Sequence, residues 1–151
     1  MIDIRKVDHV GIRVRDKARS VAFYEAIGFV TLADGGFEQG HPIIMEHPSG
    51  VVLNLLGPAT GEPGPNVLMD VETKHPGYTH VSFRVGSLAA VRAFLEAREI
   101  PITGQFSFGD LSAIFIRDPD GSVIELDEYA GEEPTTRAKP DDDFAAYRDH
   151  E

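Results

Sequence analysis

The chain has 151 residues, of which 42% are hydrophobic and 26% charged, the proportions of one globular domain with its own core. A formal net charge of −11 argues against nucleic-acid binding, and no apolar run is long enough for a membrane span or a signal peptide. Because there is no cysteine, any metal must be held by nitrogen and oxygen ligands. We therefore expect a cytoplasmic protein that binds neither membranes nor nucleic acid.

The first half of the chain predicts one strand, one helix and three further strands. The β-branched run at 7–14 indicates a buried strand, and Asp16 is a suitable N-cap for a helix that ends near Gly28. Glycine- and proline-containing turns then separate three apolar stretches with strand character, at 29–33, 43–47 and 51–56.

The second half repeats this order after a glycine- and proline-rich linker at 58–76. A strand is expected at 78–85, followed by a helix from Ser87 to about Arg98 and strands at 101–106, 111–117 and 122–128. Module one thus covers 5–57 and module two 77–129 of a single domain at 1–130. The remaining residues, 131–151, form a polar tail in which a short helix could start at Asp141.

The two halves match each other at a constant offset of 71 positions. This offset places His9 on His80 and Asn54 on Glu125, with no gap over roughly fifty residues. A self-match of this length indicates two copies of one βαβββ unit that share a core. We therefore predict an α+β fold in which two tandem βαβββ modules form a concave mixed sheet.

The matched polar residues have the composition of a metal site. His9 and His80 lie early in the first strand of each module, and Asn54 and Glu125 lie in the last strand. A carboxylate at the centre of a strand, as Glu125 is, costs free energy unless it is paired or coordinated. Two histidines and one carboxylate form the facial triad that binds Fe(II) or Mn(II) and leaves positions open for substrate. Zinc, nickel and cobalt are equally compatible with these donors, so we predict a divalent metal ion held by His9, His80 and Glu125.

Two stretches of the sequence carry a family resemblance. The opening Asp8-His9-Val10-Gly11-Ile12-Arg13-Val14 and the close Asp118-Pro119-Asp120-Gly121-Ser122-Val123-Ile124-Glu125-Leu126 resemble the vicinal oxygen chelate superfamily, which includes glyoxalases, bleomycin resistance proteins and extradiol dioxygenases. The resemblance implies a glyoxalase-like fold and a divalent metal that chelates two neighbouring substrate oxygens. It also implies His9, His80 and Glu125 as metal ligands, with Asn54 where some members place a fourth.

Departures from the individual subfamilies leave three functions open. Glyoxalase I usually has glutamate at the position of Asn54, whereas bacterial methylmalonyl-CoA epimerases can place an amide there. Extradiol dioxygenases normally carry a tyrosine where this chain has Phe115. The favoured function is a glyoxalase- or epimerase-like isomerase or lyase that polarises a carbonyl or enolate, with Glu125 and Asn54 as catalytic residues. The alternatives are an Fe(II) ring-cleaving dioxygenase and a non-catalytic binder of a small molecule such as an antibiotic.

Three further residues are predicted to contact the substrate. Arg13 and Arg84 share the strand parity of the two histidines and so face the same side, where they can meet an anionic group of the substrate; the alternative is that they form salt bridges at the rim of the sheet. Phe115 is assigned to the same substrate-facing set. The partners we expect are a small-molecule substrate and a second copy of the chain, because a small sheet protein with open edges favours a homodimer.

Overall fold

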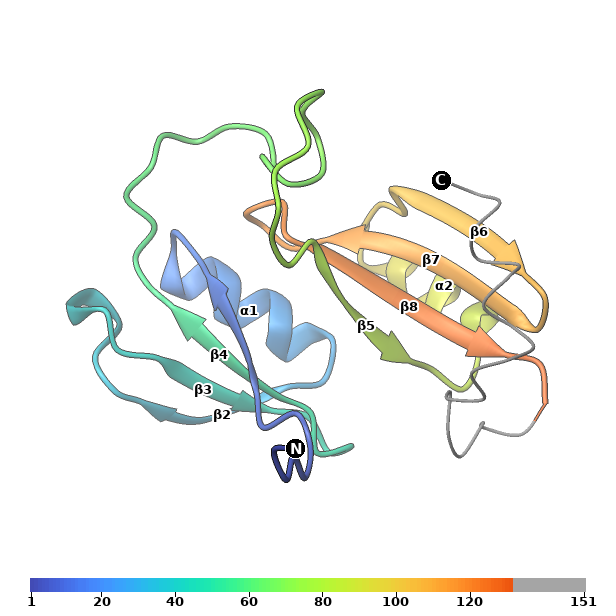
Figure 1. Ribbon diagram of the computed structural model, residues 1–151, viewed down its shortest axis with the longest axis horizontal. Coiled ribbons are helices and arrows are strands. Elements are labelled where there is room, and N and C mark those ends of the chain that lie inside the picture. Colours follow the sequence, from blue (N-terminus) through green and yellow to red (C-terminus); the bar gives the residue numbers. More distant parts are fainter. Residues whose placement is uncertain (132–151) are drawn as a thin grey trace.

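The structure is a computed structural model, and it describes residues 1–131. It contains two four-stranded sheets, each carrying one helix, which lie side by side (Figure 1). Module one consists of β1 (Val10–Arg13), α1 (Lys17–Ala26), β2 (Val30–Asp34), the 3₁₀ turn η1 (Phe37–Gln39), β3 (Ile43–Glu46) and β4 (Val52–Leu56). Module two consists of β5 (His80–Arg84), α2 (Leu88–Ala97), β6 (Gly104–Phe108), β7 (Leu111–Arg117) and β8 (Val123–Tyr129). The short helix expected from Asp141 lies outside the described residues.

Both sheets have the same mixed topology. The strand orders are β1-β4-β3-β2 and β5-β8-β7-β6, and the first strand of each module pairs in parallel with the last. The predicted α+β fold of two tandem βαβββ modules is therefore confirmed. In the described residues β1 and β5 each have a strand neighbour on one side alone, so each module has an open edge beside its predicted histidine.

Local sequence signals fix the two helices. The Asp16 side chain accepts a hydrogen bond from the Arg19 amide at 2.7 Å, and the Ser87 hydroxyl accepts one from the Ala90 amide at 3.1 Å. Gly28 follows α1 with φ of +109°, a conformation that favours glycine, and turns the chain into β2. Both helices have ten residues, and no helix in the described part of the chain is long and apolar enough to cross a bilayer.

Several strands are shorter than predicted or shifted by a few residues. β1 begins at Val10 because its ladder with β4 starts with the pair Val10–Leu53, which leaves residues 7–9 without strand partners. β6 occupies Gly104–Phe108 instead of 101–106. Pro101 has no amide hydrogen for a ladder, and the first bond to β7 comes from the Thr103 amide.

The two modules share one hydrophobic core and are joined by a set of polar contacts, here called the latch. The buried Tyr24 hydroxyl of α1 donates to Asp118 at 2.9 Å, and Asp118 lies in the turn between β7 and β8. In the same turn, Asp120 accepts from the Arg15 amide and from the Arg19 guanidinium, at 3.0 and 2.9 Å. The latch therefore ties the turn between β7 and β8 to α1 and to Arg15 just before it.

The apolar contacts between the modules come from the faces that carry the helices. Phe29 of module one and Phe83 of β5 have ring centroids 6.0 Å apart, and both belong to the core formed with α1 and α2. The opposite face of each sheet, which we call the open face, carries the polar residues that alternate with these core residues. This packing decides where the two halves of the predicted site lie.

Candidate functional site

The open face of module two carries a close histidine–carboxylate pair. His80 Nε2 lies 2.8 Å from Glu125 Oε2, and the two residues come from the adjacent parallel strands β5 and β8. The other ring nitrogen of His80, Nδ1, lies 2.8 Å from the Thr79 hydroxyl. With Nε2–H donating to the Glu125 carboxylate, the Thr79 hydroxyl donates to Nδ1, whereas a metal bound at Nε2 would require the other tautomer, in which Nδ1–H donates to Thr79. The structure thus brings together two of the three predicted ligands.

A second carboxylate lies beside this pair. Asp127, two residues after Glu125 on the same side of β8, is buried and accepts a hydrogen bond from the Ser82 hydroxyl at 2.5 Å. Its other oxygen, Oδ1, is buried with no hydrogen-bond partner among the described residues. Burial raises the pKa of Glu125, and the neighbouring Asp127 raises it further, while His80 opposes the shift. The pKa of Glu125 is therefore set mainly by its burial and by a second acid on the same face of β8.

Asp127 and Ser82 were not among the predicted site residues. The signal for Asp127 was present, since the two-residue period of a strand places it on the side of Glu125. Ser82 matches Gly11 in the repeat, so the comparison of the two modules gave no sign of its hydroxyl contact.

The open face of module one carries the matching half of the site. His9 Nδ1 donates to the Asp8 carboxylate at 2.7 Å, which leaves Nε2 as the nitrogen with a lone pair. Asp8 and Thr79 are also 71 positions apart, so both histidines are oriented by the residue that precedes them. On β4, Asn54 has a buried Oδ1 without a partner among the described residues.

Within one protomer the two halves are separate. In the described part of the chain no three histidine or acidic side chains are grouped closely enough to hold a metal. The start of β1, next to the N-terminus, and the start of β5 lie in different parts of the molecule (Figure 1). The structure of one chain therefore does not bring His9 together with His80 and Glu125, and the set of three ligands stays a prediction.

The predicted substrate-binding residues lie on the open faces as well. The Arg13 guanidinium donates to the Gly57 carbonyl at 3.2 Å, and the Arg84 guanidinium lies 4.3 Å from the centre of the Tyr129 ring. Phe115 of β7 contacts His80 edge to face, with ring centroids 6.1 Å apart. Their roles toward a substrate remain predictions.

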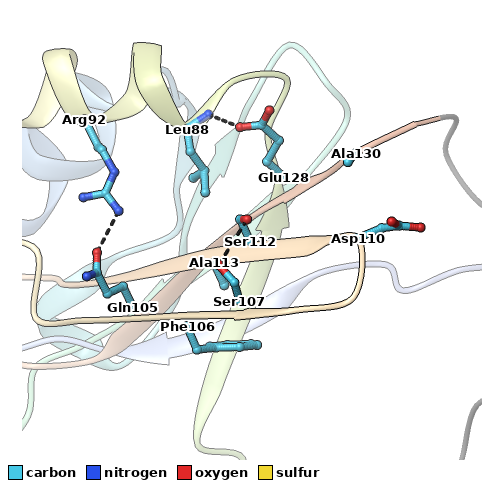
Figure 2. A pocket seen from close by; sticks show the side chains of 10 residues that line it. All are labelled: Leu88, Arg92, Gln105, Phe106, Ser107, Asp110, Ser112, Ala113, Glu128 and Ala130. Atoms are coloured by element: carbon cyan, nitrogen blue, oxygen red, sulfur yellow. Dashed lines mark hydrogen bonds between the residues drawn. The ribbon is translucent and has the colours of Figure 1, made fainter. Parts of the chain in front are cut away.

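Two cavities lie away from the predicted metal ligands, and Arg84 lines the second of them. One, of about 530 Å³, lies between α2 and the strands β6 to β8 and is lined by polar groups such as Arg92, Gln105 and Glu128 (Figure 2). Its hydrogen bonds are internal, since Arg92 donates to Gln105 and the Leu88 amide to Glu128. The other, of about 460 Å³, lies between the modules and is mainly apolar. Neither is lined by a predicted metal ligand.

The family model described as the Glyoxalase/Bleomycin resistance protein/Dioxygenase superfamily matches residues 6–126. A glyoxalase family protein from Enterococcus faecalis has 23% identity and a TM-score of 0.70, with 84% of this chain and 100% of that chain covered. A glyoxalase/dioxygenase from Nostoc punctiforme has 22% identity and a TM-score of 0.68, with 85% and 94% covered. These likenesses show the fold, and no curated protein sequence matches this one. Because the family model spans most of the chain, the protein belongs to the glyoxalase/bleomycin resistance protein/dioxygenase superfamily.

Proposed function

We propose that this protein is a divalent-metal-dependent enzyme that polarises a carbonyl or enolate of a small oxygen-bearing substrate, as a glyoxalase- or epimerase-like isomerase or lyase. The observation that carries the proposal is the shared orientation of the two histidines. His80 and His9 each use Nδ1 to contact the residue before them, which presents Nε2 to the open face. In metal sites, histidine ligands are oriented by a hydrogen bond of this kind at the nitrogen that does not bind the metal.

The residues present fit a divalent ion. Nitrogen from histidine together with carboxylate and amide oxygens suits iron, manganese, zinc, nickel and cobalt. Asn54 Oδ1 is buried and has no hydrogen-bond partner among the described residues. A bound cation would satisfy this acceptor, which otherwise costs free energy. His9, His80 and Glu125 would hold the ion, with Asn54 as a fourth donor. When bound, the ion supplies Lewis-acid stabilisation of negative charge on substrate oxygen.

We propose that the site is completed in a homodimer. His9 and Asn54 of one copy would meet His80 and Glu125 of the other, because the two open faces of one chain do not bring them together. The open edges of β1 and β5 support this arrangement, since each lies beside one half of the site. Edges of this kind are favoured places for pairing with a second chain.

The other residues of the site would divide between proton transfer and substrate binding. Glu125 can accept and return a proton, and burial already raises its pKa toward the range that this role needs. An amide is a very weak base, so Asn54 would orient and not deprotonate the substrate. Arg13 and Arg84 would contact an anionic oxygen of the substrate.

Metal analysis of protein purified without added metal tests this proposal. The wild type should contain close to one divalent ion per site, and His80→Ala should lose it while keeping its circular dichroism spectrum. His41→Ala, which changes an exposed loop histidine, is the matched control and should retain the metal. Exchange of solvent deuterium into a 2-oxo or acyl-thioester substrate would support the isomerase. Oxygen uptake on catechols would instead indicate the dioxygenase, and a wild type without metal would refute the proposal.

A further inference from the structure

The polar cavity of about 530 Å³ under α2 lies where module one is filled by an aromatic ring. In module one, Phe37 of η1 is buried and packs so closely on Gly57, at the end of β4, that a Cβ there would lie 1.8 Å from the ring. The offset of 71 places Phe108 and Glu128 at these two positions. Phe108 belongs to strand β6, and Glu128 lines the cavity. Module two therefore keeps open a space that its copy closes.

The lining of this space is polar. Arg92 of α2 stands at the position of Val21, which packs against the core of module one. The Arg92 guanidinium instead donates to Gln105 at 2.8 Å, and the hydroxyls of Ser107 and Ser112 lie 3.3 Å apart between β6 and β7. Guanidinium, amide and hydroxyl groups offer both donors and acceptors, so this lining favours a polar ligand.

The charged groups lie at opposite ends of the cavity. Figure 2 shows Arg92 with Gln105 at one end, and Glu128 and Asp110 toward the other. One carboxylate oxygen of Glu128 accepts from the Leu88 amide at 2.6 Å, which leaves its second oxygen for a ligand. Arg92 uses one of its five N–H donors on Gln105. Each end therefore keeps hydrogen-bonding groups of one charge directed at the cavity.

The strand register gives the spacing of the two ends. Arg92 contacts Gln105, which lies two residues before Ser107 on β6. Glu128 is level with Ser107, because both residues are paired with Ser112 of β7. Two residues of a strand span about 7 Å, so the charged ends are offset by about that distance. A ligand that contacts both ends needs an anionic and a cationic group separated by several bonds.

We propose that this cavity is a second binding site, for a short linear zwitterion such as a dipeptide or an ω-amino acid. The ligand carboxylate would bind Arg92, because a guanidinium pairs well with a carboxylate. The ligand ammonium group would bind Glu128 and Asp110, and the hydroxyls of Ser107 and Ser112 would contact the chain between them. An α-amino acid is too short to reach both ends. The site lies on the opposite face of the sheet from the proposed metal ligands of module two.

Calorimetric titration of the full chain with 5-aminopentanoate tests the inference. The compound should bind with a Kd below about 1 mM, and glycine, pentylamine and pentanoate, which lack the length or one charge, should bind at least about tenfold more weakly. Arg92→Gln and Glu128→Gln should each weaken 5-aminopentanoate by about three- to tenfold. Glu128→Gln keeps an oxygen that can accept from the Leu88 amide, so the start of α2 stays capped. Arg98→Gln removes a guanidinium at the end of the same helix, outside the cavity, and should bind as the wild type does.

Three results would overturn the inference. The first is no binding of 5-aminopentanoate up to about 10 mM. The second is equal binding of pentylamine, because the arginine end would then contribute nothing. The third is equal weakening by Arg98→Gln and Arg92→Gln, which would reduce the effect to a general loss of positive charge. A wild type without metal would refute the proposed function and leave this inference standing, since no proposed metal ligand lines the cavity.

Discussion

Two variants that each fail to bind metal should regain metal binding when they form a heterodimer, if the metal site is shared between protomers. His9→Ala and His80→Ala each remove one proposed ligand, and each homodimer would then have two damaged sites. In a heterodimer of the two variants, one site would carry both substitutions and the other would carry neither. Random assembly of equal amounts gives half heterodimers, so about one quarter of all sites should regain metal.

The assay uses co-expression of the two variants with different affinity tags. Purification on both tags isolates heterodimers, which should contain about half the metal of the wild type, and plasma mass spectrometry measures it. Co-expression of His9→Ala with itself under the two tags is the control and should give no metal. Heterodimers without metal would refute the shared site, because sites built within one chain cannot be repaired by mixing. Full metal content in His9→Ala alone would refute His9 as a ligand.

Two further variants test the latch and the fourth donor. Tyr24→Phe removes the donor to the buried Asp118 and should lower the free energy of unfolding by about 1–3 kcal/mol, measured by urea denaturation. Burial raises the pKa of Asp118 in the folded protein above its ordinary value of 3.8. Between these two pKa values the folded state binds more protons than the unfolded state, so the free energy of unfolding falls as the pH rises through this window. The lost donor raises this pKa further, so the destabilisation should be larger at a pH above this window than at a pH below it, and equal effects on the two sides would contradict the argument. Asn54→Ala should weaken metal affinity by at least about tenfold, yet change the stability of the metal-free protein little, because Oδ1 has no partner among the described residues; unchanged affinity would exclude Asn54 as a donor.

The sequence was sufficient for the fold because its signals are local and occur twice. The N-caps Asp16 and Ser87, the β-branched runs and the turn glycines each determine their own segment, and the repeat provides an independent check on every element. The pairing of His80 with Glu125 also followed from the sequence. Both lie on strands that the βαβββ order makes neighbours, with the side-chain parity that places them on one face.

The arrangement of the two modules could not be predicted in the same way. A repeat states that two units are similar but gives no information on which faces meet. That choice depends on contacts between residues far apart in the sequence, such as Tyr24 with Asp118 and Phe29 with Phe83. The contact of Ser82 with Asp127 was missed for a related reason, because it has no counterpart at Gly11 in the other module.

The latch connects this arrangement to the proposed chemistry. Asp118 and Asp120 belong to the turn that carries the family resemblance, yet their side chains hold α1 and not the ligand pair. Asp118 and Asp120 hold the helix-bearing faces of the two modules against each other. In this arrangement the two half-sites of one chain lie apart, and the edges of β1 and β5 stay open. If a second copy supplies the missing half, a change at Tyr24 should alter metal binding as well as stability, although Tyr24 touches no ligand. The turn between β7 and β8 would then affect the metal site indirectly, because it determines whether the same chain or a second copy supplies the missing ligands.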